Sequence, residues 1–136
     1  MMDANKILTI GIDYRVVRGG VAAVENVYST FYQPFNHVTT TVANGQVKKI
    51  LVLCKAILQF LCWMLFHPEI KIVHVQGSVG ASFWRKAIFI YIAKFFHKKV
   101  VWHMHAGRFA VFYQQHRCAV RKIVDKSDVI IALSEY

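Results

Sequence analysis

Short apolar runs alternate with longer segments of helical periodicity, and this alternation constrains the fold more than any other feature of the chain. Five runs are apolar and rich in β-branched residues, as buried strands are: residues 6–12, 37–42, 71–75, 99–104 and 128–133. Four segments of helical length separate them: residues 21–32, 48–66, 79–96 and 108–126. This alternation predicts a single three-layer α/β domain over residues 1–136, with a parallel sheet in the order β-α-β-α-β-α-β-α-β.

The loops after the strands are where function is expected, because such sheets bind ligands at the carboxyl ends of their strands. These loops are residues 13–20, 76–78, 105–108 and 134–136. Gly19 and Gly20 end the first loop and open a helix. Such a turn can bring backbone N–H groups close to an anion, although a plain tight turn has the same sequence. The chain has neither a G-x-G-x-x-G nor a G-x-x-x-x-G-K-[ST] motif, which disfavours dinucleotide and P-loop sites.

Histidines lie in or directly after several of the predicted strands. His103 and His105 are two positions apart, so both side chains should point to the same face of the sheet. No carboxylate or cysteine stands nearby to complete a metal site, and we expect no metal. We expect His103 to be buried and hydrogen-bonded, and His74 to be structural. His105 falls at the carboxyl end of its strand, where an imidazole can contact a substrate hydroxyl or phosphate.

Two arginines lie beside the same loops. Arg108 begins the last helical segment, and Arg18 directly precedes the glycine pair. A guanidinium at either position can hold an anionic group or remain solvated, and the sequence leaves both interpretations open.

The formal net charge of +10 predicts an anionic partner. The basic residues are scattered, without an arginine- or lysine-rich arm and aromatic stacking platforms, so nucleic acid is disfavoured. The three cysteines are an odd number, and Cys54 and Cys62 are eight positions apart on a predicted helix, too far to bridge. No signal peptide is visible. Reduced thiols and a cytoplasmic location are the simplest interpretation.

The most apolar segment, from Lys48 to Phe66, raises the question of a membrane. Lys55 and Gln59 interrupt it, and it reaches only the short limit for a membrane span. We favour a helix packed in the α/β layers. The alternative is a peripheral helix at an anionic membrane surface, with Trp63 and Phe66 near lipid. A spanning helix is the least favoured of the three.

Four segments together resemble the N-terminal domain of GT-B glycosyltransferases, specifically the retaining family-4 group. They are similar to the family's first strand with its Gly-Gly loop, its second histidine-bearing strand, its His-Gly loop and the strand before its interdomain region. In this chain Gln76 replaces the family's second histidine. The segments are residues 6–27 (KILTIGIDYRVVRGGVAAVENV), 71–86 (KIVHVQGSVGASFWRK), 98–109 (KKVVWHMHAGRF) and 125–136 (DKSDVIIALSEY).

The resemblance implies a Rossmann-like domain that forms half of a GT-B architecture. In this family the first domain holds a sugar or lipid-linked sugar acceptor, and a second domain holds most of the nucleotide-sugar donor. By the resemblance, Gly19 and Gly20 would face the donor diphosphate, and His105 would be the catalytic residue beside the transferred sugar. Transfer would proceed with retention, without a metal or cofactor. The acceptor side would be lined by Arg108, Gln76, Gly77, Ser78 and Arg18.

The chain ends at Tyr136, before the family's donor-binding domain, so we expect that it transfers no sugar by itself. The resemblance places it in bacterial surface-polysaccharide synthesis, in the cytoplasm or peripherally at the inner face of the cell membrane. One alternative is a non-catalytic, membrane-associated or partner module that supplies this domain to a separate donor-binding subunit. Another is an unrelated flavodoxin-like or nucleotide-binding protein. That class would need a hydroxyl- and glycine-rich phosphate loop, which residues 14–18 do not provide.

Overall fold

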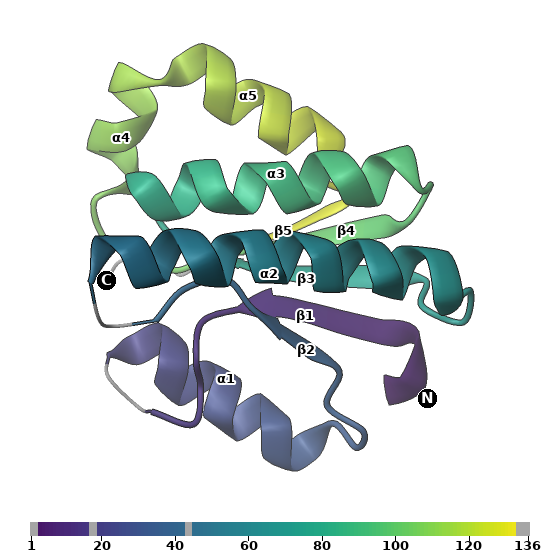
Figure 1. The fold of residues 1–136 in the computed structure, drawn as a ribbon. Coiled ribbons are helices and arrows are strands. Elements are labelled where there is room, and N and C mark those ends of the chain that lie inside the picture. Colours follow the sequence, from purple (N-terminus) through teal and green to yellow (C-terminus); the bar gives the residue numbers. More distant parts are fainter. Residues whose placement is uncertain (1–2, 17–18, 43–44, 133–136) are drawn as a thin grey trace.

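The computed structural model describes residues 3–16, 19–42 and 45–132, which form one parallel five-stranded sheet and five α-helices (Figure 1). A short 3₁₀ turn, η1 (Ala4–Lys6), precedes the first strand. The strands are β1 (Ile7–Gly11), β2 (His37–Thr39), β3 (Ile72–Gly77), β4 (Lys99–Met104) and β5 (Val129–Ala132). The helices are α1 (Gly20–Phe31), α2 (Gln46–Phe66), α3 (Ala81–Phe95), α4 (Phe109–Gln115) and α5 (Arg117–Lys126).

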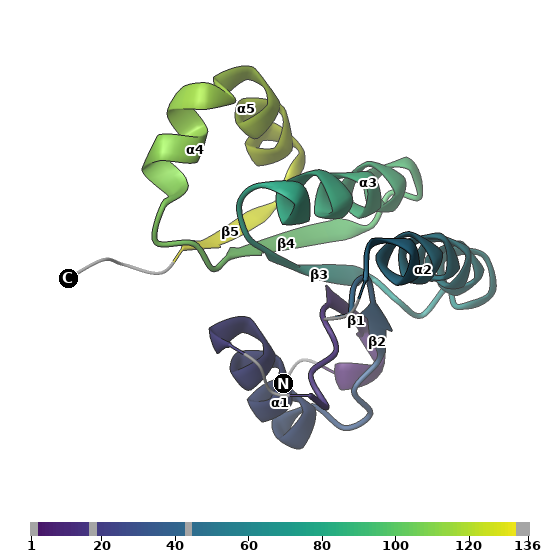
Figure 2. The same ribbon diagram turned by 60° about the vertical axis from the view of Figure 1, so that its left-hand side comes forward.

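The strand order is β2-β1-β3-β4-β5, and every neighbouring pair is parallel. The chain steps from β1 to β2 in one direction and then continues from β3 in the other. Right-handed crossovers therefore place α1 on one face of the sheet and the other four helices on the opposite face (Figure 2). This order is that of doubly wound, flavodoxin-like sheets, whose ligand crevice lies between β1 and β3. An α/β fold with a parallel sheet is thus confirmed.

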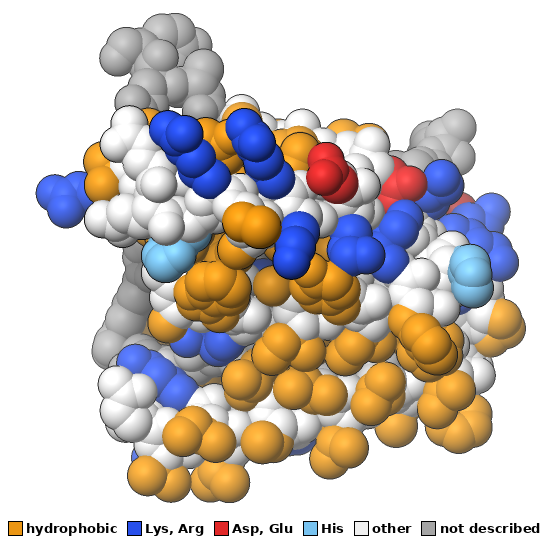
Figure 3. Space-filling view, turned by 90° about the horizontal axis from the view of Figure 1, so that it is seen from above, with side chains coloured by type: hydrophobic (Ala, Val, Ile, Leu, Met, Phe, Trp, Pro, Cys, Tyr) orange, Lys and Arg blue, Asp and Glu red, His pale blue; other side chains and the backbone are white. Residues whose placement is uncertain are grey.

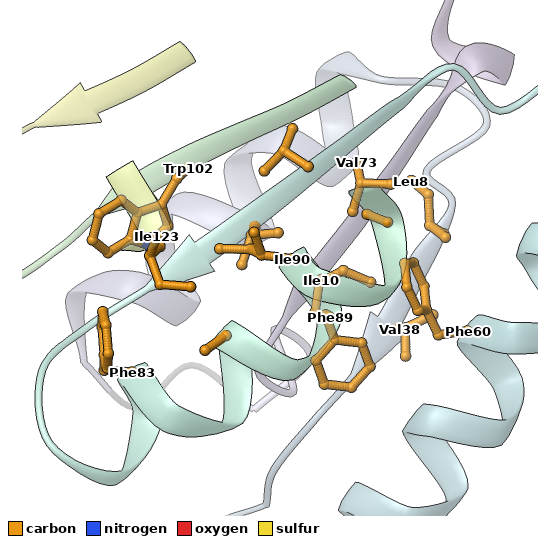
Figure 4. Close-up of a cluster of buried hydrophobic side chains, with 14 of the residues drawn as sticks. Leu8, Ile10, Val38, Phe60, Val73, Phe83, Phe89, Ile90, Trp102 and Ile123 are labelled. Atoms are coloured by element: carbon orange, nitrogen blue, oxygen red, sulfur yellow. The ribbon is translucent and has the colours of Figure 1, made fainter. Parts of the chain in front are cut away.

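The hydrophobic core lies between the sheet and the helices α2, α3, α4 and α5 (Figure 4). Phe60 of α2 meets Phe89 of α3 with ring centroids 5.3 Å apart, and both side chains are fully buried. Trp102 projects from β4 into this layer, and its indole lies over Gly77 of the neighbouring strand. Any larger residue at position 77 would collide with Trp102 Nε1, so this glycine has a packing role.

Three sequence predictions need correction. Gln76 and Gly77 were predicted in a loop but are the last two residues of β3, where they pair with β4. The predicted helix 108–126 is two helices, divided at His116. The second strand ends at Thr39 instead of residue 42.

The expectation of helices covering both faces of the sheet is only partly correct. On the α1 side, Tyr28 reaches His74 of β3 and His103 of β4. All four residues of β5 are exposed, and α1 is the only described helix on that face. The sheet therefore presents apolar β5 side chains that the described residues leave uncovered.

Candidate functional site

Helix α1 begins at the carboxyl edge of the sheet, as predicted from the glycine pair. Gly19 is its N-cap, with a φ of 95° and no side-chain cap, and the space around Gly19 and Gly20 is open. Two further helices begin in the same way, α2 at Gly45 (φ 58°) and α3 at Gly80 (φ 66°). Uncapped helix starts with free N–H groups thus recur along this edge, and their geometry does not single out Gly19.

The α1 side of the sheet carries a linked group of polar side chains near the carboxyl ends of β3 and β4. Gln76, which is 1 % exposed, lies between two histidines. Its Oε1 is 2.5 Å from His105 Nε2, and its Nε2 is 3.2 Å from His74 Nε2. The rings of His103 and His105 are 3.9 Å apart, which confirms that both point to the same face. We call His74, Gln76, His103 and His105 the histidine cluster.

Burial sets the protonation state of this cluster. Burial, and then the proximity of His103 and His105, lowers the pKa of His74 to about 4. Burial, followed by the influence of His103, lowers the pKa of His105 to about 4, and burial also lowers the pKa of His103. All three rings are therefore neutral at pH 7.

Neutral rings give the hydrogen bonds a direction. The Gln76 amide oxygen must accept from His105 Nε2–H, and the Gln76 amide nitrogen must donate to His74 Nε2. His105 Nδ1 therefore carries a lone pair, which can accept a hydrogen bond from a hydroxyl group. His103 differs from its prediction: it is buried, but its Nδ1 has no hydrogen-bond partner among the described residues.

A second polar network surrounds the end of β1, and the sequence analysis missed it. Glu25 of α1 is fully buried, accepts the Ile12 N–H with both carboxylate oxygens at 3.2 Å, and lies 2.9 Å from His37 Nε2. On the other side of the sheet, Lys86 of α3 donates to the Gly11 carbonyl at 2.9 Å.

Thr40 completes this network. Its hydroxyl donates to the Gly11 carbonyl at 2.7 Å and accepts from Lys86 Nζ at 2.5 Å. The signal available in the sequence was a charged residue on the apolar side of each helix. Glu25 follows the buried Ala22 by three positions, and Lys86 follows the buried Phe83 by three.

Stability should respond to the charge of Lys86. Burial lowers the pKa of Lys86 to about 7, with Glu25 opposing the shift and Arg85 adding to it. Between pH 7 and pH 10.5 the unfolded chain binds a proton that the folded chain has released, so the free energy of unfolding should rise with pH. Urea unfolding at a series of pH values measures this rise.

The variant Lys86→Met separates this effect from general titration. The Gly11 carbonyl keeps its two hydrogen bonds from Thr40, so the variant should fold. We expect its stability to rise much less over the same pH range. Lys122→Met, on the exposed side of α5, should keep the rise of the original chain. Equal pH dependence in all three proteins would contradict a buried, neutral Lys86.

A pocket of about 370 Å³ lies where the loop after β1 meets β2 and α2. Two cationic side chains, Arg15 and Lys55, contribute to its wall beside three aromatic rings. The Arg15 guanidinium lies 5.3 Å from the centroid of the Tyr14 ring. Sequence reasoning did not find this pocket, because its wall combines a loop, a strand edge and a helix. It is lined by Tyr14, Arg15, Phe35, His37, Thr39, Val42, Val52, Lys55, Ala56 and Gln59.

The remaining predicted site residues are spread along the carboxyl edge. Arg108 is the N-cap of α4, and Ser78 lies in the turn after β3. Gly77 lies in β3, and its carbonyl accepts the His105 N–H at 2.9 Å, so it joins the two strands at this edge. Arg18 and the predicted loop 134–136 lie outside the described residues. Within residues 3–16, 19–42 and 45–132, no three His, Cys, Asp or Glu side chains could hold a metal ion together.

Comparisons with known proteins give no relative. No protein-family model, no curated protein and no solved structure matches this chain.

Proposed function

We propose that this chain is the acceptor-binding half of a retaining glycosyltransferase that uses a nucleotide-sugar donor in bacterial surface-polysaccharide synthesis. The observation that carries the proposal is the neutral Gln76–His105 pair near the edge of the sheet where α1 begins at Gly19. A sugar presents hydroxyl groups and no charge, so it suits neutral hydrogen-bonding side chains. A nucleotide diphosphate suits the N–H groups at an uncapped helix start.

The residues at the carboxyl edge have different roles in sugar binding and transfer. His105 accepts a hydrogen bond from a sugar hydroxyl through Nδ1, and Gln76 fixes the tautomer that frees this atom. Ser78 and Arg108 extend the acceptor side, and Arg108 can hold a phosphate of a lipid-linked sugar. A second, donor-binding domain holds most of the nucleotide sugar, while Gly19 and Gly20 face its diphosphate. Fixed N–H donors there stabilise the negative charge that develops on the leaving nucleotide.

An NMR titration of the ¹⁵N-labelled chain tests the proposal, with UDP-glucose, GDP-mannose and inorganic pyrophosphate as probes. We expect the amide signals of Gly19, Gly20 and His105 to shift with the nucleotide sugars. The amide of Gly45, an equally open helix start, is the internal control. Pyrophosphate should shift the signals of Gly19 and Gly20 but not that of His105. The variant His105→Ala should weaken nucleotide-sugar binding about five- to tenfold and leave pyrophosphate binding unchanged. Shifts centred on Gly45 would contradict this site.

A turnover assay tests whether sugar transfer requires the donor-binding domain. With radiolabelled nucleotide sugars and sugar acceptors, the chain alone should transfer no sugar. Transfer by the purified chain would show that the donor-binding half is not needed.

A second function, a non-catalytic partner or membrane-associated module, is favoured by the apolar surfaces of β5 and α2. It predicts that no probe shifts any amide of the carboxyl edge.

A further inference from the structure

Two neighbouring helices carry parallel stripes of exposed side chains, which we call the α2–α3 platform. On α2 the stripe repeats every three or four residues along the whole helix, and on α3 it covers four positions with the same spacing. In Figure 3 these hydrophobic side chains form one broad area over the two helices. The platform consists of Val47, Leu51, Cys54, Leu58, Cys62 and Leu65 from α2, and Trp84, Ile88, Tyr91 and Phe95 from α3.

The opposite side of α2 is part of the hydrophobic core. Ala56, Phe60 and Met64 are buried there, and Phe60 meets Phe89 of α3. By length and composition α2 is the one helix among the described residues that could cross a membrane, with a mean hydropathy of 1.9. Crossing would pull these three side chains out of the core and uncover the sheet. The helix can meet lipid only with its outer stripe, which is a peripheral contact.

Basic side chains outnumber acidic ones around the platform. Helices α2 and α3 contain six basic residues and no acidic residue. Lys126 of α5 places Nζ 5.0 Å from the centroid of the Tyr91 ring, directly beside the platform. Figure 3 shows further Lys and Arg side chains along this margin, with fewer Asp or Glu side chains beside them. The six basic residues are Lys48, Lys49 and Lys55 on α2, and Arg85, Lys86 and Lys94 on α3. Lys86 is buried and Lys94 pairs with Asp128, so the basic margin consists mainly of the three α2 lysines and Lys126.

This charge pattern distinguishes between possible occupants of the platform. A second copy would bring another chain of net charge +10 against the first, with its basic helices facing each other. An anionic lipid surface would instead neutralise the basic side chains and bury the apolar ones. Trp84 and Tyr91 are also the residue types that prefer the boundary between lipid and water.

We propose that the α2–α3 platform docks onto an anionic lipid surface, with its apolar stripes in the acyl boundary and its basic margin among the head groups. The two helices lie side by side on the same face of the sheet, so both stripes can contact one plane (Figure 2). The carboxyl edge of the sheet is not part of this contact. The inference does not depend on the proposed glycosyltransferase function, which concerns that edge.

Cysteine labelling tests the orientation, because all three native cysteines are exposed. Cys54 and Cys62 lie on the platform, whereas Cys118 lies on α5. Three variants, each retaining one of these cysteines and carrying serine at the other two, receive the fluorophore NBD. With phosphatidylglycerol–phosphatidylcholine vesicles containing acyl-chain doxyl lipid, the labels at Cys54 and Cys62 should shift to the blue and be quenched. The label at Cys118 should not be quenched, and equal quenching at all three positions would overturn the orientation.

Vesicle co-sedimentation measures the affinity. The double variant Leu51→Gln/Leu58→Gln should lower the partition coefficient on these vesicles about tenfold or more. Lys48→Glu/Lys49→Glu should lower it about fivefold per residue changed. The matched control is Val27→Gln/Phe31→Gln, which removes equally exposed apolar side chains from α1 on the opposite face. This control should bind like the original chain.

Three results would overturn the proposal. One is a folded chain, checked by circular dichroism, that binds neither these vesicles nor pure phosphatidylglycerol vesicles. Another is an equal loss of binding in the α1 control. The third is self-association without lipid that shifts the labels at Cys54 and Cys62 to the blue as the protein concentration rises, since a second copy would then cover the platform.

Discussion

Replacing Gly11 with alanine is expected to lower the free energy of unfolding by about 2–4 kcal/mol, although it adds only one methyl group. The new Cβ would stand where the Glu25 carboxylate now lies. That carboxylate cannot simply move aside, because it accepts the Ile12 N–H and pairs with His37 in a fully buried position. Either the strand shifts, or a buried charge loses its partners.

A double-mutant cycle distinguishes this collision from a general effect on the strand. In a chain that already carries Glu25→Ala, the added Cβ meets no carboxylate, so Gly11→Ala should cost less than about 1 kcal/mol. The control Gly20→Ala adds a methyl group in the first turn of α1, where the space is open, and should be neutral or slightly stabilising. Urea unfolding measures all four free energies, and additive costs at positions 11 and 25 would contradict the collision.

The strands and most helices could be predicted because their signals are local. An apolar run such as residues 99–104 matches β4 because a strand buried on both faces needs this composition whatever its neighbours are. The glycine at the start of α1 was equally visible, since only glycine readily takes the φ of 95° found there.

The features that the sequence did not reveal depend on distant partners. Gln76 belongs to β3 because it pairs with His103 of β4, and nothing near Gln76 in the sequence indicates how far that pairing extends. The break between α4 and α5 has no glycine or proline. It occurs at His116, whose ring packs against Trp84 and Phe112.

In the candidate site, too, the sequence predicted the local features and missed the contacts between distant residues. The sequence placed His105 at the carboxyl end of its strand and on the same face as His103, because alternation along a strand is local. It could not show that Gln76 connects His105 to His74, or that Lys86 and Glu25 meet the end of β1 from opposite sides. Those contacts exist only after the sheet has assembled. The strand order likewise does not choose between a glycosyltransferase half and a flavodoxin-like protein, because a fold alone does not specify a function.

Acid should destabilise this protein between pH 6.5 and about 4, well above the range in which carboxylates usually act. The pKa values of His74 and His105 are both lowered to about 4, so in this window the unfolded chain binds protons that the folded chain does not. The contribution of these histidines to the free energy of unfolding is therefore fully present above pH 6.5 and is lost as the pH decreases towards 4. His74 is the more deeply buried of the two, and it contributes about 3 kcal/mol to the free energy of unfolding above pH 6.5. Asp128, whose pKa is lowered by its hydrogen bonds to Lys94 and Val100, contributes only below pH 3.8.

The variant His74→Phe distinguishes the histidine cluster from other acid-sensitive groups. Phenylalanine preserves the stacking on His103 but cannot be protonated, and it leaves the Gln76 amide without its acceptor. We expect a loss of about 1–3 kcal/mol at pH 7 together with a shallower decline between pH 6.5 and 4.5. His97→Asn is the matched control, because His97 is exposed and asparagine tolerates its φ of 57°. Urea unfolding at half-unit pH intervals measures the slopes. If His74→Phe and His97→Asn decline with the same slope as the original chain, His74 is not a buried neutral ring, and the hydrogen-bond direction that frees His105 Nδ1 is lost with it.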